Sequence, residues 1–283
     1  MTAESGESPA APARWMQAVR ENVAQGFTWL LRPSRPRLLQ RTGISLGVWL
    51  ATGAVLLVAI TLWQMVMFDA AGMRFARTLP HSLVDGFNFL TDFGKSGWFL
   101  IPLGAALFAV ALFTTPSLPR MTRAVLATIA MRCSFAFLAI ALPSVFVSLL
   151  KRVIGRARPI TGSFDPFAYM PPVWRSDYAS MPSGHTTTAF AAAFAVAALW
   201  PRLAPAMAAY ALIIAASRVV VLAHYPSDAV AGAFVGLAGA FLVREYFAAR
   251  GLVFAVDPSG GISPKPGPSW RRIKAIARPG TGQ

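Results

Sequence analysis

Residues 203–247 read LAPAMAAYALIIAASRVVVLAHYPSDAVAGAFVGLAGAFLVREYF, and this stretch decides the fold. It contains two apolar runs, 203–222 and 229–247, and each is close to the ~20 residues that a helix needs to cross the hydrocarbon core of a bilayer. A short segment with His224 and Asp228 separates the runs, and its proline favours a turn. The pattern predicts two transmembrane helices joined by a polar turn.

The rest of the chain has the same apolar character. Of its 283 residues, 55% are hydrophobic and 13% are charged, and its mean hydropathy is +0.54, which lies outside the usual balance of a soluble globular domain. Four further apolar runs cover residues 43–68, 96–114, 122–150 and 186–200. We therefore predict an all-α fold, a six-span transmembrane helical bundle, over residues 43–249.

Two basic tails flank this bundle. Residues 1–42 place apolar side chains from Trp15 to Leu30 at roughly helical spacing, as an interfacial helix does, although a partly ordered tail also fits. Residues 250–283 are rich in Pro, Gly, Lys and Arg, which favours a disordered tail near anionic headgroups. Because the first apolar run is long enough to remain as a span, we expect no signal peptide.

The basic residues indicate the orientation, since cytoplasmic flanks are enriched in Lys and Arg. They collect in the two tails and in the loops that contain Arg120 and Arg202, which a six-span chain places on one side. Both termini are therefore predicted to be cytoplasmic. The first outer loop is nearly neutral, because three aspartates, among them Asp69, balance its cations. Only a dense basic cluster at residues 151–158 breaks the trend.

The formal net charge of +15 also raises the question of nucleic-acid binding. The cations lie in tails and between apolar runs, however, rather than along one amphipathic helix or an aromatic-lined sheet. We therefore expect an anionic lipid as the partner and no nucleic acid. Cys133 is the only cysteine, which excludes an internal disulfide and argues against a thiol-ligated metal site.

The basic cluster, KRVIGRARP at residues 151–159, directly follows the third apolar run. Pro159 is predicted to end the helix, so that the cations project into the interfacial layer. A cation at the bilayer centre costs ~2.5–3.5 kcal/mol, so this cluster belongs at the membrane surface or in a wet cavity. An ordinary stop-transfer flank has the same composition.

Two more polar clusters lie at the ends of neighbouring runs. Ser183 and Gly184 precede the fourth run, where free backbone N–H groups and the helix dipole favour an anion, although a simple helix cap is the plainer interpretation. In the third cluster, Asp228 follows His224 by four residues. It can accept the Nδ1–H of His224 and leave Nε2 as a base or nucleophile, or it can simply cap a helix.

Topology places all three clusters on the same, non-cytoplasmic side. Together they supply three cations, two neutral hydrogen-bond donors, two histidines and one carboxylate: Lys151, Arg158, Arg218, Ser183, Gly184, His185, His224 and Asp228. Cations and amides can hold the charge on phosphate oxygens in a transition state, so this inventory suits metal-free phosphoryl transfer. A metal bound by the two histidines and the carboxylate is conceivable, but the three adjacent cations oppose a dication.

The spacing of these residues carries a family resemblance. Six residues separate Lys151 from Arg158-Pro159, the fourth run opens with Pro182-Ser183-Gly184-His185, and five and three residues separate Arg218, His224 and Asp228. This resembles the three-part signature of the type 2 phosphatidic acid phosphatase (PAP2) superfamily, over about residues 120–245. The superfamily also includes vanadium haloperoxidases, which are soluble and therefore fit a six-span chain poorly.

The resemblance implies a PAP2-type bundle, a lipid phosphatase without a cofactor, and a role for each matching residue. His224 would attack phosphorus to form a phosphohistidine, Asp228 would orient it, and His185 would protonate the leaving oxygen and then activate water. The phosphate would be held by Lys151, Arg158, Ser183, Gly184 and Arg218. Arg152 and Arg156 occupy no fixed position of the signature, so we expect them only to contact headgroups or solvent.

The sequence leaves several functions open. The phosphohistidine could pass its phosphate to water or to another lipid, and a catalytically silent lipid-binding protein would keep the same anion site. Undecaprenyl diphosphate, phosphatidic acid, phosphatidylglycerol phosphate and a lipid A phosphate all remain candidate substrates. The expected location is the inner membrane, with the site on the periplasmic side.

Overall fold

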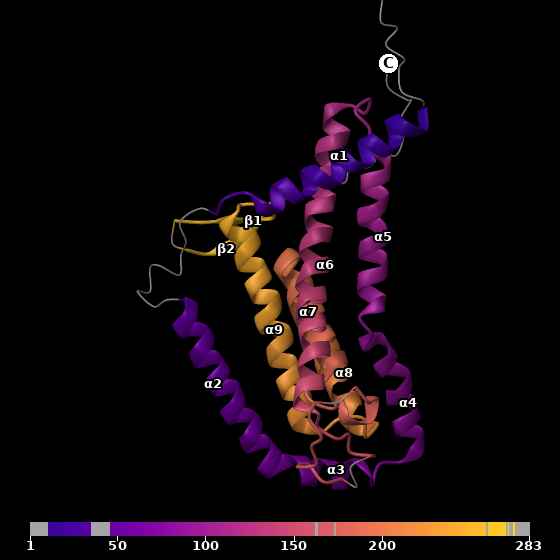
Figure 1. Ribbon diagram of the computed structural model, residues 1–283, viewed down its shortest axis with the longest axis vertical. Coiled ribbons are helices and arrows are strands. Elements are labelled where there is room, and N and C mark those ends of the chain that lie inside the picture. Colours follow the sequence, from indigo (N-terminus) through magenta and orange to yellow (C-terminus); the bar gives the residue numbers. More distant parts are fainter. Residues whose placement is uncertain are drawn as a thin grey trace, which may run out of the picture.

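The computed structural model of this chain describes residues 11–34, 46–161, 164–172, 174–258, 260–269, 271 and 274. It is mostly helical, which confirms the predicted fold class (Figure 1). The elements are α1 (Ala11–Leu31), α2 (Leu46–Gln64), the π-helix η2 (Met65–Asp69), α3 (Ala70–Ala76), α4 (His81–Thr91), η3 (Asp92–Gly94), α5 (Gly97–Phe113), α6 (Arg120–Ile154), η4 (Ser176–Tyr178), α7 (Gly184–Leu199), η5 (Pro201–Leu203), α8 (Ala204–Val220), α9 (Pro226–Ala249), β1 (Phe254–Val256) and β2 (Ile262–Pro264).

The centre of the bundle is α7, which packs against α6, α8 and α9. Its sequence is rich in alanine, and small side chains let neighbouring helices approach closely. Ala191, Ala192 and Ala195 are fully buried and share a core with Phe135 and Phe247, whose rings meet edge to face with centroids 5.5 Å apart. The small face of α7 thus lets aromatic residues of α6 and α9 close around it.

Two glycines fix the distance between α9 and α7. A methyl group on Gly232 would lie 2.5 Å from the carbonyl oxygen of Ser183, and one on Gly236 would lie 2.4 Å from that of Thr187. No side chain fits at either position without moving a helix backbone. This contact holds the start of α9 against the start of α7, where Asp228 and Ser183 lie.

The number of spans differs from the prediction. Within the described residues, five helical segments are long and apolar enough to cross a membrane: Gly47–Ala76, His81–Phe113, Arg120–Ile154, Pro201–Val220 and Pro226–Ala249. The predicted fourth span corresponds to α7, which has only 16 residues and falls short of the ~20 that a bilayer requires. The helical bundle is therefore confirmed, but the count of six full-length spans is not.

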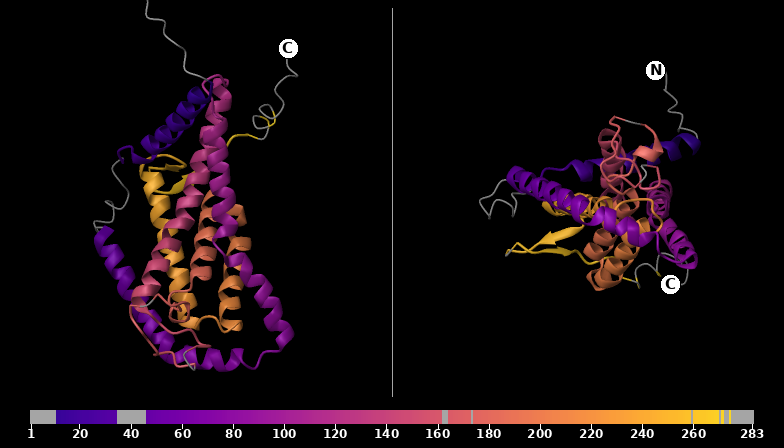
Figure 2. Two further views of the ribbon diagram at one scale, coloured as in Figure 1. Left: turned by 45° about the vertical axis from the view of Figure 1, so that its right-hand side comes forward. Right: turned by 90° about the horizontal axis from the view of Figure 1, so that it is seen from below.

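The two ends of the bundle are built differently. At the lower end of Figure 1, α3 runs across the base and the long loop after α6 folds beneath the bundle. At the upper end, α1 lies across the helices, next to the β1–β2 hairpin (Figure 2). A helix thus precedes the first span, and the β1–β2 hairpin lies within the tail that was predicted to be disordered. Outside the described residues lie 1–10, 35–42, 259, 270, 272, 273 and 275–283 of the predicted tails and 43–45 of the first predicted span.

The helix of the third predicted span ends before Pro159, the residue that was predicted to end it. Helix α6 stops at Ile154 because Gly155 takes a left-handed conformation, with φ 62°, which glycine adopts without steric cost. Its N–H donates to the carbonyl oxygen of Lys151 at 3.0 Å. Only Lys151 and Arg152 therefore belong to the last helical turn, while Arg156 and Arg158 lie in the following loop.

Candidate functional site

The structure brings all eight predicted site residues to one end of the bundle. The ends of α6 and α8 and the starts of α7 and α9 meet at the lower end of Figure 1. The site residues therefore come from four helix ends and from the loops beside them. Because each helix is packed into the core, their backbones are held rigidly relative to one another.

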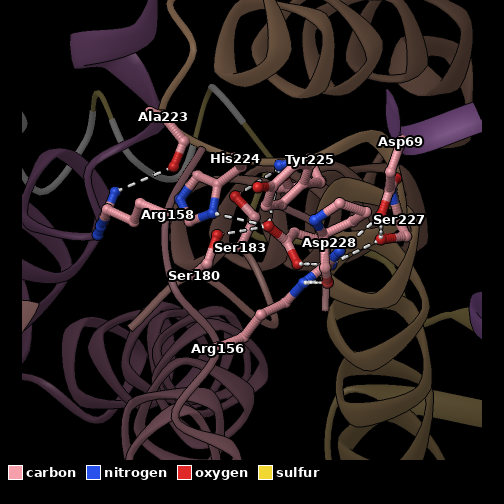
Figure 3. Close-up of polar contacts among 12 residues, drawn as sticks. Asp69, Arg156, Arg158, Ser180, Ser183, Ala223, His224, Tyr225, Ser227 and Asp228 are labelled. Carbon is pink, nitrogen blue, oxygen red and sulfur yellow. Dashed lines mark hydrogen bonds and ion pairs between the residues drawn. The ribbon is translucent and has the colours of Figure 1, made fainter. Parts of the chain in front are cut away.

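His224 and Asp228 form a buried pair. Their side chains are 2% and 0% exposed, and His224 Nδ1 lies 3.7 Å from Asp228 Oδ2, longer than an ordinary hydrogen bond (Figure 3). The backbone N–H of His224 donates to the carbonyl oxygen of Arg218 at 3.1 Å. Burial lowers the pKa of His224 to about 4, although Asp228 acts in the opposite direction. The imidazole is therefore neutral at ordinary pH, as a nucleophile must be.

Asp228 also has the helix-capping role that was the alternative interpretation. Its Oδ2 accepts from the backbone N–H of Tyr225 at 2.9 Å, which completes a capping box at the start of α9. The same oxygen accepts from the hydroxyl of Ser180 at 2.5 Å. The cap and the pairing with His224 thus use one carboxylate, and the cap fixes where that carboxylate points.

Arg156 holds the other oxygen of Asp228. Its Nη1 donates to Asp228 Oδ1 at 2.6 Å, its Nη2 donates to Asp69 Oδ2 at 2.7 Å, and all three side chains are fully buried (Figure 3). Burial alone would lower the pKa of Arg156, yet this pKa is raised, because Asp228 and Asp69 favour the charged guanidinium. The expectation that Arg156 only contacts headgroups or solvent is wrong.

Asp69 anchors this network to the start of α9. Its Oδ2 accepts from the hydroxyl of Ser227 at 2.6 Å, and its Oδ1 accepts from the Ser227 backbone N–H at 2.9 Å. Asp69 comes from η2, which lies far from the signature in sequence. In the sequence it was counted only among the aspartates that balance the cations of the first outer loop. An acidic residue directly after an apolar run was the signal that could have identified it.

The predicted anion-binding groups lie around the start of α7. Lys151 Nζ would be 3.5 Å from a methyl group on Gly184, so the ammonium lies next to the first turn of α7. Ser183 precedes that turn and is fully buried, and its N–H donates to the carbonyl oxygen of Asp228 at 3.0 Å. The lysine and the free N–H groups of a helix start therefore face the same region.

Two arginines flank His224. Arg158 donates from Nη1 to the carbonyl oxygen of Ala223 at 3.3 Å and from Nε to that of Ser176 at 2.9 Å. Arg218 donates from Nη1 to the hydroxyl of Thr91 at 2.7 Å. In the described part of the chain, Arg218 Nε is buried without a hydrogen-bond partner, so a donor remains for an anionic group.

His185 completes the group from the first turn of α7. The charges of Arg218 and Lys151 both act on this side chain. Gly94 packs against it, since a methyl group there would lie 3.1 Å from both Cβ and Cδ2 of His185. No cluster of three or more His, Cys, Asp and Glu side chains suited to a metal ion occurs among the residues that the structure describes.

Comparisons with known proteins identify the family. The profile of the PAP2 superfamily matches residues 132–252. A lipid A 1-phosphatase from Rhizobium johnstonii is 33% identical over 232 residues, which cover 80% of this chain and 93% of the relative. One from Rhizobium etli is 34% identical over 217 residues, 75% of this chain and 90% of the relative.

Two solved structures are also similar. The crystal structure of LpxE from Aquifex aeolicus is 22% identical, with a TM-score of 0.44, over 62% of this chain and 93% of that one. A PAP2-type phosphatidylglycerolphosphate phosphatase from Bacillus subtilis is 19% identical, with a TM-score of 0.43, over 69% and 94%. The family profile and the length of the match to the two Rhizobium relatives decide the assignment: this multi-pass membrane protein belongs to the PAP2 superfamily.

Proposed function

We propose that this protein hydrolyses a phosphate monoester of lipid A, at the 1-position, through a phosphohistidine on His224. The observation that carries the proposal is the buried His224–Asp228 pair, at 3.7 Å, between Arg158 and Arg218. A neutral imidazole oriented by a carboxylate is a nucleophile, and cations beside it stabilise the charge that a phosphoryl group spreads over its oxygens.

The proposed reaction has two steps. In the first, His224 Nε2 bonds to phosphorus while the bond from phosphorus to the ester oxygen breaks, and His185 gives its proton to the leaving oxygen. In the second, His185 takes a proton from water, the water oxygen bonds to phosphorus, and the bond to His224 breaks. The products are the dephosphorylated lipid and inorganic phosphate.

The charge of the phosphate is held without a metal in this proposal. Lys151, Arg158 and Arg218 supply three cations, and the Ser183 hydroxyl and the Gly184 N–H lie at the start of α7. The charges of Arg158 and Arg218 both act on Lys151, so an anion between them would relieve their repulsion. The phosphate itself is the natural counterion of this group.

The substrate follows from the relatives. Both Rhizobium relatives have the name lipid A 1-phosphatase, and the match covers 93% and 90% of their lengths, so it includes the regions outside the signature. The relatives therefore favour a lipid A phosphate over undecaprenyl diphosphate, phosphatidic acid and phosphatidylglycerol phosphate.

The protein would lie in the inner membrane with both termini in the cytoplasm and the site at the periplasmic surface. Helix α1 and the β1–β2 hairpin lie at the same end of the bundle, opposite His224 (Figure 1). Tyr246, near the end of α9, donates to the carbonyl oxygen of Leu30 in α1 at 2.9 Å. The described parts of both tails thus lie on one side.

The test is phosphate release by the purified protein from each of the four lipids, with a chelator present and with His224→Ala as the control. We expect lipid A 1-phosphate to react fastest and the variant to be inactive. Equal rates on all lipids would contradict the substrate assignment, and an active His224→Ala would contradict the phosphohistidine. Mass spectrometry of the lipids would reveal transfer to a second lipid instead of water.

A further inference from the structure

A cavity of about 900 Å³ lies at the end of the bundle opposite His224. Helix α1 lies along one side of the cavity, and α5, α6 and the segment after α9 contribute most of the remaining lining. Figure 1 shows these elements together at the upper end of the bundle. The catalytic residues contribute nothing to this lining. A ligand here would bind independently of the phosphatase site.

Helix α1 is fastened at two points rather than lying loosely on the bundle. Asn22 donates to the carbonyl oxygens of Ala111 at 2.9 Å and Thr114 at 2.6 Å, at the end of α5. At the other end of α1, the hydroxyl of Tyr246 donates to Leu30. These hydrogen bonds hold a wall of the cavity in place.

The lining combines positive charge with apolar surface. Among the described lining residues there are four cations, Arg32, Arg123, Arg132 and Lys265, and one carboxylate, the exposed Glu21, which accepts from Gln17. The apolar part of the lining includes Phe27, Leu30, Leu107, Val110, Met131 and Leu252. A cavity with both surfaces suits a molecule that carries an anionic group and a hydrocarbon chain.

Three of the cations lie in or beside the segment that follows α9. A methyl group on Gly251 would lie 3.4 Å from Arg32 Nη2 and 3.8 Å from Lys265 Nζ. Arg132 donates from Nη2 to the carbonyl oxygen of Lys265, and its Cζ would lie 3.4 Å from a methyl group on Gly267. The Lys265 ammonium also donates to the carbonyl oxygen of Gly251 at 2.5 Å. Arg32, Arg132 and Lys265 thus place positive charge along one rim of the cavity, where it would attract an anionic headgroup.

We propose that this cavity binds an anionic glycerophospholipid of the leaflet opposite the active site. Its phosphate would lie among Arg32, Arg132 and Lys265, and an acyl chain would lie against the apolar part of α1, α5 and α6. The positive-inside distribution of cations places this end in the cytoplasmic leaflet, where such lipids attract basic groups. The bound lipid would fasten α1 and the β1–β2 hairpin to the bundle.

Native mass spectrometry of the purified full-length protein tests this proposal. The protein is incubated with phosphatidylglycerol or with phosphatidylcholine, and the bound lipid is counted. Both lipids carry a phosphate, but only phosphatidylglycerol has a net negative charge. We expect preferential retention of phosphatidylglycerol, and roughly fivefold weaker retention for each cation removed by Arg132→Gln or Lys265→Gln. Because two cations are replaced separately, the measurement still decides the proposal if one of the two variants perturbs folding.

Two controls locate the lipid. Arg120→Gln removes an exposed cation that lies at the same end of the bundle as the cavity but does not line it. Arg158→Gln removes a cation at the catalytic site. Both should retain phosphatidylglycerol as the unchanged protein does. Equal losses for Arg120→Gln and Arg132→Gln would reduce the effect to general charge attraction and overturn the proposal. Loss of phosphatidylglycerol in Arg158→Gln alone would also overturn the proposal. Displacement of the lipid by inorganic phosphate alone would do the same.

Discussion

At the residue scale, Asp228 is the most constrained group of the site. One oxygen accepts from Ser180 and Tyr225 and lies beside His224, and the other accepts from Arg156. Asp69 then balances the charge of Arg156. The orientation of the proposed nucleophile therefore depends on a residue from η2, although no fixed position of the signature lies there.

Replacing Arg156 should be far more damaging than replacing its neighbour Arg152. Arg156→Met leaves Asp69 and Asp228 buried without their cation, and breaking a buried pair in this way costs ~3–5 kcal/mol of unfolding free energy. Arg152 is partly exposed and donates to the carbonyl oxygen of Arg175, so Arg152→Met is the matched control. Thermal unfolding measures the loss of stability in each variant, and phosphate release measures the loss of activity.

A double variant separates stability from activity. Arg156→Met with Asp69→Asn removes one uncompensated charge, so we expect partial recovery of the unfolding temperature without recovery of phosphate release, since Asp228 still lacks its partner. Similar behaviour of Arg152→Met and Arg156→Met would contradict the positioning role of Arg156.

The pH dependence of phosphate release should report the buried state of His224. The neutral imidazole is the attacking form, and burial lowers its pKa to about 4, so the acid limb of kcat/KM that His224 causes should lie near pH 4. An acid limb near 6.5, the ordinary value for histidine, would contradict the observed burial.

Unfolding has to be followed over the same pH range. The unfolded state takes up the proton near pH 6.5 and the folded state only near 4, so the contribution of His224 to stability falls as pH drops between these values. Thermal unfolding scans at each pH separate this loss of stability from protonation of the nucleophile.

At the element scale, the contact of α9 with α7 positions the site. Gly236→Ala would place a methyl group 2.4 Å from the carbonyl oxygen of Thr187 and push the helices apart, at a cost of ~1–3 kcal/mol. In Gly104→Ala the nearest atom, Phe137 Cε2, lies 3.7 Å away, so this helical glycine is the matched control. The unfolding temperature and phosphate release should both fall in Gly236→Ala alone.

The sequence predicts apolar elements well and long-range polar partners poorly. The apolar runs locate α5, α6, α8 and α9, because lipid-facing helices must be apolar along their length. The end of α6 at Gly155 was not predicted, because Pro159 is the stronger helix-ending residue in the sequence. The pairing of Arg156 with Asp69 was missed for another reason: they are 87 positions apart in the chain, and local spacing carries no information on such contacts.

At the scale of the whole molecule, the site and the tails lie at opposite ends. The long loop after α6 lies at the His224 end, while α1 and the β1–β2 hairpin lie at the other (Figure 2). If the membrane lies across the bundle between them, a water-soluble reagent can reach only one end from each side. The orientation of the phosphatase site is then measurable without its substrate.

Cysteine labelling measures this orientation. In a Cys133→Ser background, Trp174→Cys places a thiol in the loop after α6, where the present side chain is 81% exposed, and Ser117→Cys places one in the loop between α5 and α6. An impermeant maleimide added to intact cells should label the first variant, and the second only after the inner membrane is broken. The reverse pattern would put His224 on the cytoplasmic side and contradict a periplasmic phosphatase, because α6 separates the two positions by one full crossing.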